Sequence, residues 1–93
     1  MKNKVVRCVE SLVVEKQDDG GVVFDEARGI VHVLNSTALT VLEMCTEDTV
    51  EDVIGNFIRL IDFSETDITE AEIESDVMAI ISSMLSKELL VHA

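Results

Sequence analysis

Several residue types that stabilise small proteins are scarce in this 93-residue chain, which has no proline, no tryptophan and no tyrosine. Its two cysteines, Cys8 and Cys45, are too few for a disulfide framework or a cysteine-based metal cluster. We therefore expect two reduced thiols and a cytoplasmic protein. No apolar run reaches the ~18 residues of a membrane span, and no long apolar segment follows the charged start. We expect no signal peptide and no membrane partner.

Positive charge is also scarce. Seven lysines and arginines stand against nineteen aspartates and glutamates, which gives a formal net charge of −12. Domains that bind nucleic acid through its phosphates are basic, so we expect no nucleic-acid partner. Residues 43–76 hold twelve acids and one base, Arg59, for a local charge of −11. This acidic segment is either a solvated helical surface or a surface that attracts a basic partner.

The sequence lacks the motifs of common catalytic and cofactor sites. It contains no G-x-S-x-G, H-E-x-x-H or C-x-x-C, and neither of the glycine-rich phosphate-binding patterns. His32 stands alone in an expected strand, and Cys45 falls on the apolar face of an expected helix, as a small core residue does. We therefore expect no catalysis, no metal and no cofactor. A binding or adaptor module is the favoured class.

The chain is long enough for one domain, residues 1–93, with a modest core. Runs rich in β-branched residues come first and are separated by glycine-containing turns, which is typical of an antiparallel meander. The hydrophobic period then changes from two to 3.6, which predicts helices. The expected strands are 5–16, 22–25 and 30–34, the expected helices are 36–45, 50–61 and 70–87, and residues 89–91 suit a short strand. The predicted fold class is α+β.

Capping residues support the three helices. Asn35 or Ser36 suits the first N-cap, Thr49 the second and Thr69 the third. The third helix carries an apolar arc of roughly 160°, where a helix on a single core needs about 100°. This helix is therefore either sandwiched between two layers or lends one apolar column to a ligand. Acidic and small residues on its flank would leave room for a ligand backbone.

Four segments together resemble the signature of PqqD-like proteins. Residues 29–44 read Gly-Ile-Val-His-Val-Leu-Asn-Ser-Thr-Ala-Leu-Thr-Val-Leu-Glu-Met, a strand that ends in Leu-Asn and is followed by an alanine and an aliphatic pair. Thr49–Ile54 is similar to the family's Thr-Val-x-x-Ile, and Ile73–Val77 to its Ile-x-x-Asp-Val. Leu85–Leu90 is similar to the closing Leu-x-x-x-Gly-Leu/Val, with Glu88 in place of the glycine. The resemblance covers residues 20–91.

This resemblance implies a winged helix-turn-helix, with a three-stranded antiparallel sheet followed by three helices, that is known as a RiPP recognition element. Such domains bind the leader segment of a ribosomally synthesised precursor peptide and present it to a modifying enzyme. In the family the leader adds as a strand to the edge of the third strand, against the third helix. Carried onto this sequence, the implied peptide-binding residues are Ile30, Val31, His32, Val33, Leu34, Glu72, Asp76, Val77, Ala79, Ile80 and Ser83.

The resemblance also implies the partners, which are a leader peptide and a separate enzyme. That enzyme is either a leader peptidase, as in lasso-peptide pathways, or a radical-SAM enzyme. The residues alone are compatible with this role, because an exposed strand edge offers unpaired N–H and C=O groups to a peptide. The alternative interpretation of residues 30–34 is a plain inner strand of the sheet. The alternative function is a non-catalytic regulatory adaptor, or a homodimer joined through the same edge strand.

Overall fold

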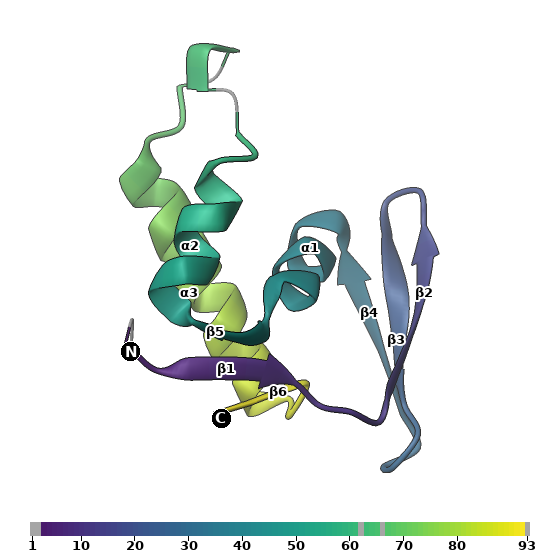
Figure 1. The fold of residues 1–93 in the computed structure, drawn as a ribbon. Helices are drawn as coiled ribbons and strands as arrows, with labels where there is room; N and C mark the ends of the chain where they lie inside the picture. The colour runs from purple at the N-terminus through teal and green to yellow at the C-terminus, as the bar shows by residue number, and fades with distance from the viewer. Residues whose placement is uncertain (1–2, 62, 66, 93) are drawn as a thin grey trace.

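A computed structural model describes residues 3–61, 63–65 and 67–92 of the chain. Most strands precede the helices, as expected (Figure 1). The strands are β1 (Val5–Cys8), β2 (Leu12–Gln17), β3 (Gly20–Asp25), β4 (Ile30–Asn35), β5 (Thr46–Thr49) and β6 (Leu90–His92). The helices are α1 (Ser36–Met44), α2 (Val50–Ile58) and α3 (Glu70–Ser86), with a 3-10 turn, η1 (Phe63–Glu65), before α3. The predicted α+β winged helix-turn-helix, a three-stranded antiparallel sheet followed by three helices, is confirmed.

Strands β2, β3 and β4 form the predicted meander, in that order and antiparallel. Gln17 pairs with Gly20, so two residues, Asp18 and Asp19, make the turn between β2 and β3. Gly20 is buried and has a φ of 138°, and a Cβ at this position would collide with the carbonyl oxygen of Leu34. Glycine is therefore required at this position, where β3 faces the backbone of Leu34 and Asn35 at the end of β4.

A second antiparallel sheet has β1 at its centre, in the order β5-β1-β6. The expected strand 5–16 thus splits into β1 and β2, which belong to different sheets. Strand β6 confirms the expected short C-terminal strand. Strand β5 has the polar sequence Thr-Glu-Asp-Thr, which no hydrophobic pattern predicts. Glu47, with a φ of 66°, lies where the register between β5 and β1 shifts, and it is the extra residue of a β-bulge.

The helices begin where the capping residues predict. The side chains of Asn35, Thr49 and Thr69 accept hydrogen bonds from the backbone N–H three residues later, at 2.8, 3.1 and 3.2 Å. Each bond satisfies an N–H group that the helix itself leaves without a partner. Helix α2 ends at Ile58, three residues earlier than expected, because the N–H groups of Leu60 and Ile61 bond to carbonyls three residues back and tighten the chain after the helix.

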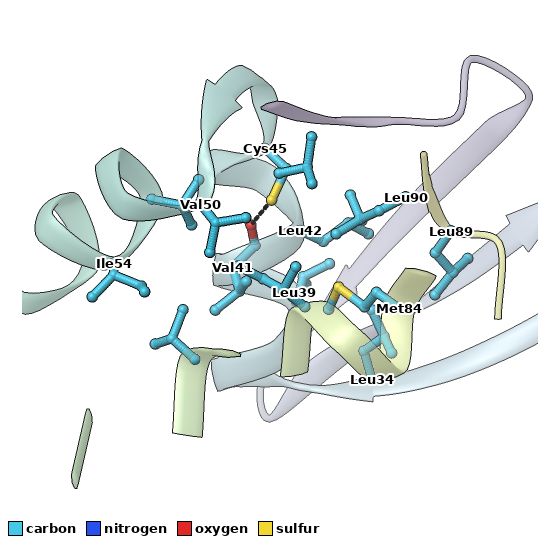
Figure 2. Packing of buried hydrophobic residues seen from close by; sticks show 14 of the residues in the cluster. Leu34, Leu39, Val41, Leu42, Cys45, Val50, Ile54, Met84, Leu89 and Leu90 are labelled. Atoms are coloured by element: carbon cyan, nitrogen blue, oxygen red, sulfur yellow. Dashed lines mark hydrogen bonds between the residues drawn. The ribbon is translucent and has the colours of Figure 1, made fainter. Parts of the chain in front are cut away.

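One hydrophobic core joins the three helices to both sheets (Figure 2). Its members are Val6, Val23, Leu34, Leu39, Val41, Leu42, Cys45, Val50, Val53, Ile54, Ile73, Val77, Ile81, Met84, Leu89 and Leu90. The position of Cys45 confirms it as a core residue. Helix α3 packs against α1, α2 and β6, so its wide apolar arc serves more than one neighbour. Ile80 is only half-buried, which leaves part of this arc uncovered.

Candidate functional site

Strand β4 is an edge of its sheet. It pairs with β3 on one side, and no other strand in the described part of the chain pairs with its opposite side. In Figure 1 it is the strand of this sheet that lies nearest the helices. The interpretation of residues 30–34 as an inner strand is therefore wrong, and the interpretation as an edge holds.

The hydrogen bonds around β3 show which residues of β4 face the open edge. Glu26 donates its N–H to the Ser11 carbonyl at 3.1 Å on the β2 side, and the Asp25 carbonyl accepts from Gly29 at 2.8 Å on the β4 side. Successive residues of a strand alternate sides, so Gly21, Val23 and Asp25 face β4. Their partners are Leu34, His32 and Ile30. The N–H and C=O groups of Val31 and Val33 therefore point outward, to the unpaired side.

The side chains of β4 alternate as a half-buried strand requires. Leu34 turns inward and is only 7% exposed, with the core formed by α1 beneath it. Val31 and Val33 lie on the other face and are 55% and 80% exposed, and Ile30 is also exposed. His32 is half-buried. Apolar side chains with this exposure on an unpaired strand offer contact area to an added segment.

A hollow of about 180 Å³ lies where the end of β4 meets α3. It is lined by Leu34, Ala38, Ala79, Ile80, Ser83, Met84 and Lys87. We call it the proximal hollow; Leu34 and Met84 of its wall appear in Figure 2. Four of the predicted site residues, Leu34, Ala79, Ile80 and Ser83, thus come together around one cavity. Ile30 to Val33 form the open edge that leads to it.

The remaining predicted residues lie further along α3. Asp76 and Val77 line a separate hollow that also involves α2, and Val77 is buried there while Asp76 is exposed. Glu72 is exposed one turn earlier and lines neither hollow. The prediction missed Ala38, Met84 and Lys87. Lys87 lies four residues after Ser83, on the same face of α3 as Ala79, Ile80 and Ser83. Continuing this helical spacing by one turn would have predicted it.

Polar contacts connect the turn before β4 with the residues that follow α3. Arg28, in the turn before β4, forms an ion pair with Glu88, just after α3. Asp25, the last residue of β3, is 1% exposed and accepts hydrogen bonds from the Ser11 hydroxyl at 2.9 Å and the Ala27 N–H at 3.1 Å. These contacts link the segment between β3 and β4 to Ser11, just before β2, and to Glu88, just after α3, near the wall of the proximal hollow.

The two thiols lie side by side but away from this site. The Cys8 thiol donates to the Leu42 carbonyl at 3.0 Å, and the Cys45 thiol donates to the Val41 carbonyl at 3.2 Å. Burial, with smaller effects of Cys8 and Asp48, raises the pKa of the Cys45 thiol to about 12. Burial and then Glu43 also raise the pKa of Cys8. Thiols in this state are poor nucleophiles and poor metal ligands at neutral pH.

Among the described residues, no group of three or more histidine, cysteine, aspartate or glutamate side chains is placed to hold a metal ion. No helix in this part of the chain is both long and apolar enough to cross a bilayer.

The fold and the open strand define a winged helix-turn-helix domain whose sheet has a free edge beside a helix. The family model described as "Coenzyme PQQ synthesis protein D (PqqD)" matches residues 20–90. The chain belongs to the PqqD family. This finding confirms the resemblance noted in the sequence.

Solved structures with the same fold are known. One is described as "TbiB1 in Complex with the TbiA(beta) Leader Peptide"; it is 18% identical, covers 90% of this chain and 93% of that chain, and has a TM-score of 0.69. Another is described as "Lasso peptide synthetase B1 complexed with the leader peptide"; it is 22% identical, covers 92% and 96%, and has a TM-score of 0.69. No curated protein matched the chain.

Proposed function

We propose that this protein binds the leader segment of a ribosomally synthesised precursor peptide by adding it as a strand to β4, against α3. The observation that carries the proposal is the unpaired edge of β4 beside the proximal hollow. Main-chain hydrogen bonds to Val31 and Val33 supply affinity, and hollows along α3 select side chains. Membership of the PqqD family and likeness to two leader-peptide complexes support it.

The protein acts in this proposal as an adaptor, without chemistry of its own. It presents the bound peptide to a separate enzyme, either a leader peptidase or a radical-SAM enzyme. The thiols of half-buried Cys8 and buried Cys45 favour this role over a nucleophilic one, because their raised pKa values keep them protonated at neutral pH. Free thiols also suit a reducing compartment, so we place the function in the cytoplasm.

The proposed peptide-contacting residues fall into two groups. Ile30, Val31, His32, Val33 and Leu34 form the strand edge, and Glu72, Asp76, Val77, Ala79, Ile80 and Ser83 form the helix wall. The exposed acids of the second group attract a basic leader, consistent with the charge of −11 over residues 43–76.

Substitution of Val33 by proline tests the proposal, because proline removes the outward N–H without breaking a bond to β3. The probes are fluorescently labelled synthetic peptides copied from the N-terminal segments of short reading frames beside this gene. We expect one peptide to bind saturably, and Val33→Pro to weaken it about three- to tenfold, the worth of one hydrogen bond. Val33→Thr keeps the N–H and the branched shape, and should bind like the original. Affinities are read from fluorescence anisotropy.

Two results would contradict the proposal: no peptide binds saturably, or Val33→Pro and Val33→Thr bind the peptide equally well.

The alternative function is a homodimer joined through the same edge, which the 80% exposure of Val33 favours. A net charge of −12 on each copy opposes it. Sedimentation would show a dimer that Val33→Pro dissociates if the alternative holds.

A further inference from the structure

A second hollow, of about 440 Å³, lies beyond the end of β4, where the three helices converge. We call it the distal hollow. Its apolar lining comes from α2, the segment before α3, and α3 itself, and consists of Phe57, Ile61, Ile68, Ile73 and Val77. Thr37 and Asp76 are the polar side chains at its wall. This volume is large enough for a leucine or an aromatic side chain.

The distal hollow continues the groove of the proposed peptide site. At ~100° per residue, Ile73, Asp76 and Val77 lie on the same face of α3 as Ile80 and the rest of the proximal lining. The two hollows are also joined through α1, because Thr37 lines one and Ala38 the other. Their centres are about seven residues apart along α3, or roughly 10 Å. An extended peptide covers this distance in about three residues.

The charge of the groove changes along its length. Asp76 has no hydrogen bond or ion pair to any residue that the structure describes, and it stands one turn from the exposed Glu72. Lys87 lies at the opposite end, in the wall of the proximal hollow. A bound segment is therefore best matched when a basic residue lies at the distal end.

We infer that the distal hollow is a second anchoring point for the bound leader, and that it sets sequence preference. It takes one aliphatic or aromatic side chain, about three residues from the side chain held in the proximal hollow. Asp76 pairs with a lysine or arginine next to that anchor. This inference rests on the proposed function, and it adds the chemical class of peptide that the site selects.

A block of the distal hollow tests the inference directly. Thr37→Phe places a ring in the cavity, whereas Ser36→Phe puts the same ring on the neighbouring exposed residue, which lines neither hollow. Random 20-residue peptides displayed on phage are selected against the full-length chain, and the tightest peptide is synthesised. We expect its sequence to contain an apolar residue beside a lysine or arginine. Thr37→Phe should weaken it at least about tenfold, the worth of one buried apolar side chain, and Ser36→Phe should not.

A double-mutant cycle separates a true contact from a general disturbance. Replacing the peptide's apolar anchor by alanine should cost about as much as Thr37→Phe, and the two changes together should cost little more than either alone. Asp76→Lys should weaken the peptide about two- to fivefold, and a peptide with glutamate in place of its basic residue should recover binding to that variant. The charge-reversal experiment with Asp76→Lys still tests the inference if the Thr37→Phe variant fails to fold.

The possible results are distinguishable. If Val33→Pro weakens the selected peptide but the distal variants do not, the second anchoring point is refuted and strand addition stands. If Thr37→Phe and Ser36→Phe weaken it equally, the anchor is likewise refuted. If no peptide is enriched, both the inference and the proposed function are overturned.

Discussion

At the scale of single residues, Glu88 occupies a backbone position that usually belongs to glycine. Its φ is 61°, its N–H bonds to the Leu85 carbonyl at 3.1 Å, and the Leu89 N–H bonds to the Met84 carbonyl at 2.9 Å. This is the Schellman arrangement that closes many helices. The sequence shows that the family's glycine is replaced, and in the structure the Glu88 carboxylate forms an ion pair with Arg28.

Replacement of Glu88 by glycine should relieve the left-handed strain. In an Arg28→Ala background, where no ion pair is lost, we expect Glu88→Gly to raise the free energy of unfolding by about 1 kcal/mol. Urea denaturation followed by circular dichroism measures this. Glu88→Ala in the same background keeps the strain and serves as the control. Equal stability of the glycine and alanine variants would show that the position is not strained.

The Cys45 thiol makes stability depend on alkaline pH. Its pKa is raised from 9.0 to about 12 in the folded chain. Between these values the unfolded chain has already lost the proton that the folded chain keeps, so unfolding becomes easier as pH rises. The stabilisation is complete below pH 9.0 and is lost toward pH 12.

This loss is measurable by urea denaturation at pH 8 and pH 10. The free energy of unfolding should fall by up to about 1.4 kcal/mol per pH unit from this group. Cys45→Ala should show a shallower fall, and the difference in slope isolates the thiol. The same slope in both chains would mean that Cys45 ionises as easily in the folded state as in the unfolded one.

At the scale of elements, β4 should reveal its edge position in amide hydrogen exchange. The N–H groups of Val31 and Val33 point away from β3 and should exchange fast, whereas those of His32 and Leu34 are bonded to β3 and should exchange slowly. Bound peptide should slow Val31 and Val33 selectively. Exchange is followed by NMR on the labelled chain.

The Val22 amide is a useful control for this measurement. Its N–H faces β2, and added peptide should leave its exchange unchanged. Protection of Val22 together with Val31 would indicate general stiffening. Fast exchange of Val31 and Val33 in the presence of saturating peptide would place the peptide elsewhere.

The sequence predicts some elements far better than others, for physical reasons. Caps such as Asn35 and Thr69 act locally, through bonds to a backbone group three residues away, so their residue types are sufficient to find them. Strand β5 is different, because its four polar residues form a strand only through main-chain pairing with β1, which is far away in the sequence. The hydrophobic pattern of the sequence therefore does not predict this pairing.

At the scale of the whole molecule, β1 holds the second sheet together. It pairs with β5 on one side and β6 on the other, and Val6 is fully buried. The family match begins only at residue 20, so this central strand lies outside it. We expect a chain that lacks residues 1–8 to lose cooperative unfolding, because β5 and β6 would both lose their partner. Thermal melting followed by circular dichroism is the measurement.

Two single substitutions, one in β1 and one in β2, measure how much the burial of β1 contributes to stability. Val6→Ala should cost about 2 kcal/mol, since the side chain is buried in the core. Val13→Ala, at an exposed strand position, should cost less than about 0.5 kcal/mol. A cooperative transition in the truncated chain, at the temperature of the full one, would contradict the central role of β1.

The sequence predicts only part of the walls of the hollows along α3. Their walls combine α1, α2 and α3, and residues such as Phe57, Ile68 and Lys87 meet others there only after folding. The edge residues Ile30 to Leu34 were predicted from the family resemblance, and in the structure they lie on one continuous strand at the edge of its sheet. Residues that share an element can thus be predicted as a group, whereas the walls of a cavity formed between elements cannot be predicted in full.

Asn35 is the last residue of β4 and also the N-cap of α1, so strand and helix join without an intervening loop. A peptide that binds to β4 should therefore also stabilise the first turn of α1 and, through α1, the hydrophobic core of the domain. The melting temperature itself should therefore report occupancy: a ligand at one hundred times its Kd adds about 2.7 kcal/mol to the folded state. Candidate leaders can then be ranked in a simple heating experiment, before any enzyme of the pathway is in hand.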